Sequence, residues 1–142
     1  MKKNKLVTLY QYDFELYGIV SQIKEYTLAW YFNQIHYFDL IKGDDISIEL
    51  KDQKMLVVSN YRYETDFIKV HLLRNKLVSR GIQENHWFLP ELKQFDYFLK
   101  IGNSLEEPST DDLLAEIRKI EVIDYLLKID IGAIKLKENL LY

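Results

Sequence analysis

Two similar strand-like segments restrict how a sheet can be built from this chain. Residues 95–101, Phe-Asp-Tyr-Phe-Leu-Lys-Ile, are echoed by residues 123–129, Ile-Asp-Tyr-Leu-Leu-Lys-Ile. Apolar residues alternate along both segments, which is the period of a β-strand. If the segments were neighbours in matched register, Asp96 would face Asp124 and the two lysines would also face each other. Like charges in opposite positions destabilise a sheet, so we expect a third strand between the two copies.

The sequence between the copies predicts a helical crossover. Residues 108–112, Pro-Ser-Thr-Asp-Asp, form an acidic, capped helix start, and Leu113, Leu114, Ile117 and Ile120 then recur at helical spacing. A connection that contains a helix suits a right-handed crossover between parallel strands. With a further strand between those two, the pattern is typical of a ferredoxin-like sheet that carries two helices on one face.

The first part of the chain predicts the other strand and helix. Residues 13–20 alternate as a strand, in which Gly18 indicates a bulge or a close backbone approach. Ser21 is a candidate N-cap, and the period from Gln22 to His36 becomes helical. This helix is apolar around much of its circumference, which is typical of a helix that is deeply buried or covered by a partner. We therefore expect a homodimer.

Short alternating segments complete the expected fold. Residues 46–51, 55–63 and 67–73 predict three strands joined by turns, which form an antiparallel meander. The polar residues 74–86 predict a mobile loop. The fold class is therefore α+β: one domain over residues 1–142, with a ferredoxin-like mixed sheet, a meander that extends it, and two main helices on one face.

Composition limits the possible functions. The 142 residues carry a net charge of −3, which does not resemble the basic surface of a nucleic-acid-binding protein, and they include no cysteine. We expect a cytoplasmic protein, because no apolar run suits a secretory signal or a membrane span. No metal or other cofactor is expected: the three histidines lack ligand spacing, and His71 is interpreted as a hydrogen-bonded residue of a strand.

One short motif resembles that of a known family. Residues 89–97 read Leu-Pro-Glu-Leu-Lys-Gln-Phe-Asp-Tyr. This segment resembles the signature of the small bacterial family named for Ile-Pro-Glu, three variable residues and Val-Asp-Tyr. Leu89 and Phe95 are apolar exchanges, whereas the other four signature positions match. The resemblance implies a single-domain protein of unknown function and carries over no catalytic residue.

The motif can also be interpreted physically. Pro90 suits the first turn of a short helix, and Glu91 would then lie near a helix N-terminus, where a carboxylate is favoured. Asp96 would accept hydrogen bonds from nearby backbone, at the entry to a central strand that continues with Tyr97. This structural interpretation is preferred over a catalytic pair.

Two hypotheses of function follow. The first is a non-enzymatic domain that self-associates and binds a protein or a small ligand, with a contact surface on the first helix at Tyr26, Trp30, Tyr31 and Phe32. The alternative, with few supporting features, is an enzyme of unknown class.

The enzyme hypothesis needs a site that gathers several polar residues around the motif. Its candidate residues, which could equally form a ligand-binding site, are Arg80, His86, Glu91 and Asp96. A histidine oriented by a carboxylate is the minimum for acid–base chemistry. A deep pocket that unites these residues would favour the enzyme over the assembly hypothesis.

Overall fold

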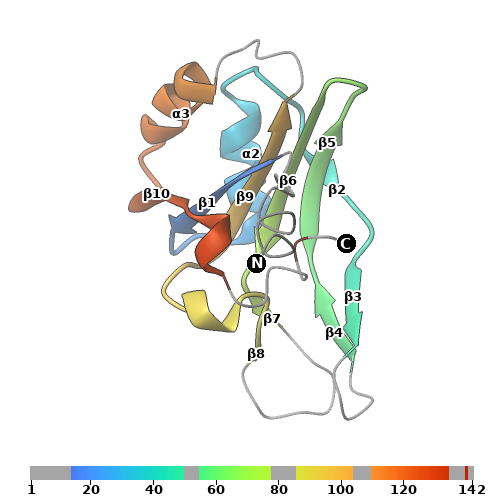
Figure 1. Cartoon of the computed structure of the whole chain (residues 1–142). Helices are drawn as coiled ribbons and strands as arrows, with labels where there is room; N and C mark the ends of the chain where they lie inside the picture. Colours follow the sequence, from blue (N-terminus) through green and yellow to red (C-terminus); the bar gives the residue numbers. More distant parts are fainter. Residues whose placement is uncertain (1–13, 50–54, 78–85, 104–109, 135–139, 141–142) are drawn as a thin grey trace, which may run out of the picture.

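The computed structural model describes residues 14–49, 55–77, 86–103, 110–134 and 140. Within them the chain forms an α+β fold around a six-stranded antiparallel sheet with two helices (Figure 1). The strands follow one another across the sheet in the order β10 (Tyr125–Ile129), β1 (Glu15–Val20), β9 (Tyr97–Asn103), β6 (Ile68–Arg74), β5 (Asn60–Glu64) and β2 (Ile41–Lys42).

Strand β1 separates the two similar segments, as the sequence predicts. Gly18 of β1 pairs with Leu127 of β10 on one side and with Phe98 of β9 on the other. Both pairings are antiparallel, so β9 and β10 run in the same direction without being neighbours. The prediction of a mixed sheet is wrong, because each described pair of neighbouring strands is antiparallel. Strands β9 and β10 are parallel to each other, but β1 lies between them.

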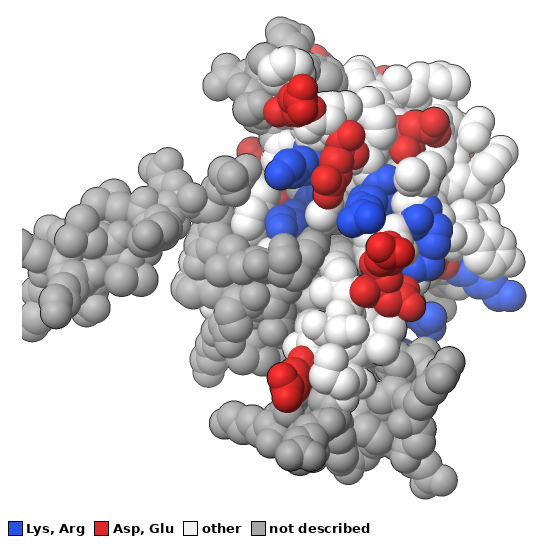
Figure 2. All heavy atoms as spheres, turned by 90° about the vertical axis from the view of Figure 1, so that its right-hand side faces the viewer, with Lys and Arg blue, Asp and Glu red and all other residues white. Residues whose placement is uncertain are grey.

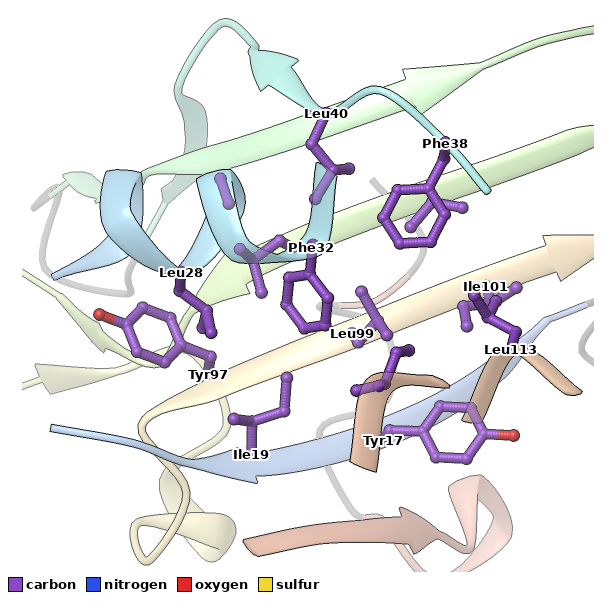
Figure 3. Close-up of a cluster of buried hydrophobic side chains, with 14 of the residues drawn as sticks. Tyr17, Ile19, Leu28, Phe32, Phe38, Leu40, Tyr97, Leu99, Ile101 and Leu113 are labelled. Carbon is purple, nitrogen blue, oxygen red and sulfur yellow. The ribbon is translucent and has the colours of Figure 1, made fainter. Parts of the chain in front are cut away.

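Helices α2 (Glu25–Asn33) and α3 (Thr110–Arg118) both pack on one face of the sheet. Leu28 and Phe32 point from α2 toward the sheet (Figure 3). The apolar positions predicted for α3 are buried, which confirms its helical period. The sheet contributes alternate residues to this core: Tyr17, Ile19, Val70, Leu72, Tyr97, Leu99 and Ile101.

The opposite face of the sheet has its own apolar core, covered by short elements. These are the hairpin β3 (Ile46–Glu49) with β4 (Met55–Val58), the pair β7 (Lys76–Leu77) with β8 (His86–Trp87), and the 3₁₀ turns η1 (Pro90–Leu92) and η2 (Ile131–Ala133). Phe88 and Leu89 are fully buried there against Phe98 and Leu73 of the sheet. Phe88 and Leu89 thus dock this segment on the body of the protein.

Gly18 allows the close approach that the sequence indicates. The ring of Phe95 lies over this glycine, and a Cβ atom added to Gly18 would come within 2.5–2.6 Å of three ring carbons. Phe95 therefore belongs to the second core, on the face opposite Tyr97. Strict alternation from residue 95 predicts that Phe95 shares a face with Tyr97. This prediction is wrong, because β9 begins only at Tyr97 and the turn before it does not alternate as a strand does.

Two further predictions need correction. The helix begins at Glu25 and ends at Asn33, shorter than predicted, and Ser21 does not cap it. The predicted strand over residues 55–63 is divided at Ser59, so that β4 pairs with β3 while β5 joins the main sheet. The side chains explain the division, since Leu56 and Val58 pack into the second core whereas Tyr61 and Tyr63 pack toward the helices.

The described surface carries both charge signs. Figure 2, which views the side of the β5 and β2 edge, shows acidic and basic side chains interspersed. Among the residues that the structure describes, no helix has the length and apolar character needed to cross a bilayer.

Candidate functional site

A groove of about 530 Å³ opens beside the N-terminal end of α2. Residues 21–26, which lead into the helix, line it together with Asp96 and Tyr97. Tyr61 of β5, Arg74 at the end of β6 and Lys76 of β7 complete the described lining. The groove therefore lies where the ends of several strands meet the start of a helix, and it combines charged and aromatic side chains.

Asp96 and Tyr97 of the motif shape the groove by holding the segment before α2. The Asp96 carboxylate accepts a hydrogen bond from the Ser21 backbone N–H at 2.9 Å, and the Tyr97 hydroxyl donates to the Ile23 carbonyl at 2.6 Å. The Ser21 hydroxyl donates to the Val122 carbonyl at 2.6 Å, which explains why it is not the helix cap. The prediction that Asp96 accepts backbone hydrogen bonds is thus confirmed.

Glu25 is the lining residue whose environment departs most from that of a surface carboxylate. Its Oε1 atom accepts a hydrogen bond of 2.6 Å from the Ser59 hydroxyl, whereas Oε2 is buried and no described residue donates to it. Burial raises the pKa of Glu25, and the Ser59 hydrogen bond and the positive charges of Lys42 and Arg74 only partly oppose this. The side chain can thus accept a further donor or hold a proton.

Replacing Glu25 with glutamine tests this environment. Because the folded protein raises the pKa of Glu25 above 4.5, the folded state binds a proton more readily than the unfolded chain. Stability that this group provides at low pH is therefore lost as pH rises through the raised pKa. Glutamine can keep the Ser59 hydrogen bond without the charge, so we expect Glu25→Gln to raise the Tm at neutral pH and to match the wild type well below pH 4.5.

Thermal unfolding from acidic to neutral pH measures this difference. Glu116→Gln is the matched control, since Glu116 lies at the surface in an ion pair with Lys119. A Glu25→Gln variant that is less stable than the wild type at neutral pH would contradict the assigned cost of burying this carboxylate.

The remaining polar groups of the groove are mainly donors. Burial raises the pKa of Tyr97 to about 12 and also raises that of Tyr61, so both hydroxyls stay protonated at neutral pH. Lys24 lies with its Nζ atom 6.0 Å from the centre of the Tyr26 ring. With Arg74 and Lys76, the lining can donate to anionic or carbonyl groups of a ligand, while Glu25 can accept from an ammonium or hydroxyl group.

The predicted site residues are not united in this groove. Asp96 lines it, whereas His86 lies in β8, where it pairs with Leu77, and Glu91 is exposed in the first turn of η1. Arg80 falls outside the described residues. The predicted positions of Pro90 and Glu91 at the start of a short helix are confirmed, and those positions have a structural explanation.

Asn75 holds the motif segment from inside the protein. It is fully buried, and its Nδ2 atom donates to the carbonyls of Leu92 at 2.9 Å and Phe95 at 2.8 Å. Its Oδ1 atom accepts from the Leu89 N–H at 3.0 Å, and its backbone N–H donates to the Asp96 carbonyl at 3.0 Å. One side chain therefore fixes both ends of the turn that delivers Asp96 and Tyr97 to the groove.

The aromatic residues predicted as a contact surface divide into two groups. Tyr26 is 60% exposed and Trp30 is 57% exposed, one helical turn apart, and Tyr31 is half-buried with its ring against Trp30 at 5.1 Å between centres. Phe32 is fully buried in the core between α2 and the sheet, so its placement in the contact surface is wrong. The helix is thus covered on one side by its own sheet and leaves Tyr26 and Trp30 in solvent.

Other features of the site have weaker signals in the sequence. His71 donates from Nε2 to the Glu64 carboxylate at 2.8 Å, as expected of a hydrogen-bonded strand histidine, and burial lowers the pKa of His71. Across the described residues, no three acidic, histidine or cysteine side chains gather closely enough to hold a metal ion.

Sequence reasoning missed Glu25, Ser59 and Asn75, because nothing local distinguishes them from ordinary surface polar residues.

Comparison with known proteins adds no family to these observations. No family model matches the sequence, and no curated protein matches it.

Proposed function

We propose that this protein is a non-enzymatic α+β binding domain that self-associates and binds a protein or a small polar ligand. The observation that carries the proposal is the groove beside α2, with the half-buried Glu25 side chain in its lining and the exposed rings of Tyr26 and Trp30 on the same helix. Concave sites with a few convergent polar groups and aromatic walls are the usual form of ligand sites. Exposed aromatic residues are common in interface cores.

The hydrogen bonds of the groove favour binding over catalysis. The Asp96 carboxylate and the Tyr97 hydroxyl, which could be an acid–base pair, are each committed to backbone groups of residues 21–23. Among the described lining residues there is no histidine that could exchange protons with them near neutral pH. The polar groups available to a ligand are therefore those of Glu25, Arg74 and the lysines, which suit recognition.

We also propose that the central strands form a ferredoxin-like core. Support comes from the order β10-β1-β9-β6, in which α2 follows β1 and α3 connects β9 to β10. Both helices lie on one face, and β5 and β2 extend the sheet beyond β6. Domains of this form serve many functions, so the groove and not the fold supports the binding proposal.

Membership of the family with the Ile-Pro-Glu and Val-Asp-Tyr signature is a further part of the proposal. It is supported by the definite structural role of three matching residues: Pro90 starts η1, Asp96 holds Ser21, and Tyr97 holds Ile23.

Arg74→Ala tests ligand binding in the groove. Dicarboxylic acids and amino acids are offered as probes in a thermal-shift assay, since their carboxylates suit the guanidinium and the lysines. We expect a binding probe to raise the Tm of the wild type by several degrees at saturating concentration. Loss of a charge-assisted hydrogen bond from Arg74 would weaken that probe roughly tenfold or more.

Two further variants complete the assay. Glu25→Gln should weaken amino-acid probes, whose ammonium groups need the carboxylate, more than dicarboxylic acids. Glu116→Gln, on α3 and absent from the groove lining, should bind like the wild type. Equal shifts of the Tm in all four proteins would contradict binding in the groove.

A further inference from the structure

We propose that two copies of this chain associate by pairing their β10 strands antiparallel across a two-fold axis, which joins their sheets into one. Strand β10 lies at the end of the described sheet, with β1 on one side and no described strand on the other (Figure 1). The inference rests on the self-association included in the proposed function and names its surface. An edge strand presents alternate N–H and C=O groups that another strand can bind.

Strand β10 is longer and more apolar than the opposite edge of the sheet, although it also carries one exposed lysine, Lys128. Tyr125 is 58% exposed and Leu127 is 47% exposed, and both point to the same face of the strand. The other edge of the sheet, β2, has only two residues, one of which is Lys42. Short, charged edges resist pairing, whereas a longer edge with exposed apolar side chains favours it. The two edges therefore differ, and β10 is the one suited to a second copy.

Charge and apolar contact together favour one register for this pairing. If Leu126 faces Leu126 of a second copy, Asp124 faces Lys128 twice, once on each side of the axis. In the same register Tyr125 faces Leu127 twice, so the exposed apolar side chains cover one another. A shift that places Leu127 on the axis would instead bring Asp124 opposite Asp130, which is unfavourable.

The residues of this register are available in the described structure. Asp124 and Lys128 are both exposed, and the backbone N–H of Asp124 donates to the Val20 carbonyl at 2.8 Å, so the edge extends to this residue. Lys128 has one acidic neighbour in its own chain, with its Nζ atom 3.9 Å from Glu15 Oε1. A contact between two short strands is small, so we expect association at roughly tens to hundreds of micromolar.

Charge variants of the full chain test the pairing by sedimentation equilibrium. Asp124→Lys and Lys128→Asp each place like charges opposite one another, and we expect each to weaken the dimer by about tenfold to a hundredfold. A mixture of the two variants should form heterodimers with near wild-type affinity, because each like-charged position then meets its opposite. Repulsion between Lys128→Asp and Glu15 within one chain cannot explain such a rescue.

Single cysteines test the register, since the natural chain has none. Facing residues of an antiparallel pair lie about 4.5–5.5 Å apart at Cα, within the range of a disulfide. Leu126→Cys should therefore cross-link to itself under mild oxidation. Tyr125→Cys and Leu127→Cys should cross-link mainly to each other when mixed. Circular dichroism is used to check that each variant is folded.

The outcomes distinguish the inference from the proposed function. A dimer that is weakened and rescued by the charge variants and cross-links at position 126 supports β10 pairing. If the charge variants leave the dimer affinity unchanged and Trp30→Asp abolishes the dimer, β10 pairing is overturned. The protein then still self-associates, but through the exposed face of α2. A wild type that remains monomeric at several hundred micromolar overturns both.

Discussion

Replacing Asn75 with alanine is expected to lower the free energy of unfolding by about 3–5 kcal/mol, because three backbone groups each lose a hydrogen bond to this side chain. These are the carbonyls of Leu92 and Phe95 and the N–H of Leu89. No bulk water reaches a side chain that is fully buried. The loss should be visible as a lower midpoint in urea with an unchanged m-value, since the compactness of the two states stays the same.

Asn75→Asp separates hydrogen bonding from volume. Aspartate has the size of asparagine but replaces the Nδ2 donor by an oxygen that faces two carbonyl oxygens. We expect it to be at least as destabilising as alanine at neutral pH and less so in acid, where a protonated carboxyl can donate once. Gln34→Ala is the control, an exposed amide with one bond to the Trp30 carbonyl, and should change stability by less than about 0.5 kcal/mol. A loss below about 1 kcal/mol for Asn75→Ala would contradict its role as the anchor of the motif.

Phe95→Ala is expected to cost about 3–5 kcal/mol, since the ring is buried in the second core. Its centre lies 6.0 Å from that of Phe98, and its other neighbour is the backbone at Gly18. Removal leaves a cavity between β1 and the turn before β9. Equilibrium unfolding measures the cost, and Phe67→Ala is the control, because Phe67 is 53% exposed and should lose less than about 1 kcal/mol.

A double-mutant cycle with Gly18→Ala tests the contact itself. In the wild type, the new methyl group would lie within 2.6 Å of the Phe95 ring, and the overpacking should cost about 1–3 kcal/mol. In the Phe95→Ala background the same methyl group enters the cavity, and the cost should disappear. Additive costs for the two changes would show that the ring does not lie over Gly18.

The order of the central strands was predictable, because side-chain alternation identifies the strands and charge indicates which strands cannot be neighbours. Like charges at Asp96 and Asp124 indicated that the similar segments are not neighbours, and β1 lies between them. Helix α3 was predictable for a similar reason, since its buried positions follow one helical stripe. The division of the third predicted segment was not, because Ser59 turns the chain from one core to the other without a glycine or proline.

The groove was less predictable than the fold. Its residues come from four separate parts of the chain, so no spacing along the sequence connects Glu25 with Arg74 or Tyr61. Asn75 lies in a run of polar residues that predicted a mobile loop, and only the turn built around it explains its burial. For Asp96, a backbone hydrogen bond was correctly predicted, but its donor was not, because Ser21 is distant in sequence and reaches Asp96 only through the fold.

The position of β1 also has a consequence for how the chain is made. Leu16 pairs with Lys100 on one side and with Ile129 on the other, although it is synthesised long before either. During translation, this apolar strand therefore leaves the ribosome without any lateral partner and can be completed only when the last strand has emerged. Pairings between residues so distant in sequence slow folding, so we expect β1 of a nascent chain to stay exposed to aggregation until β9 and β10 have emerged.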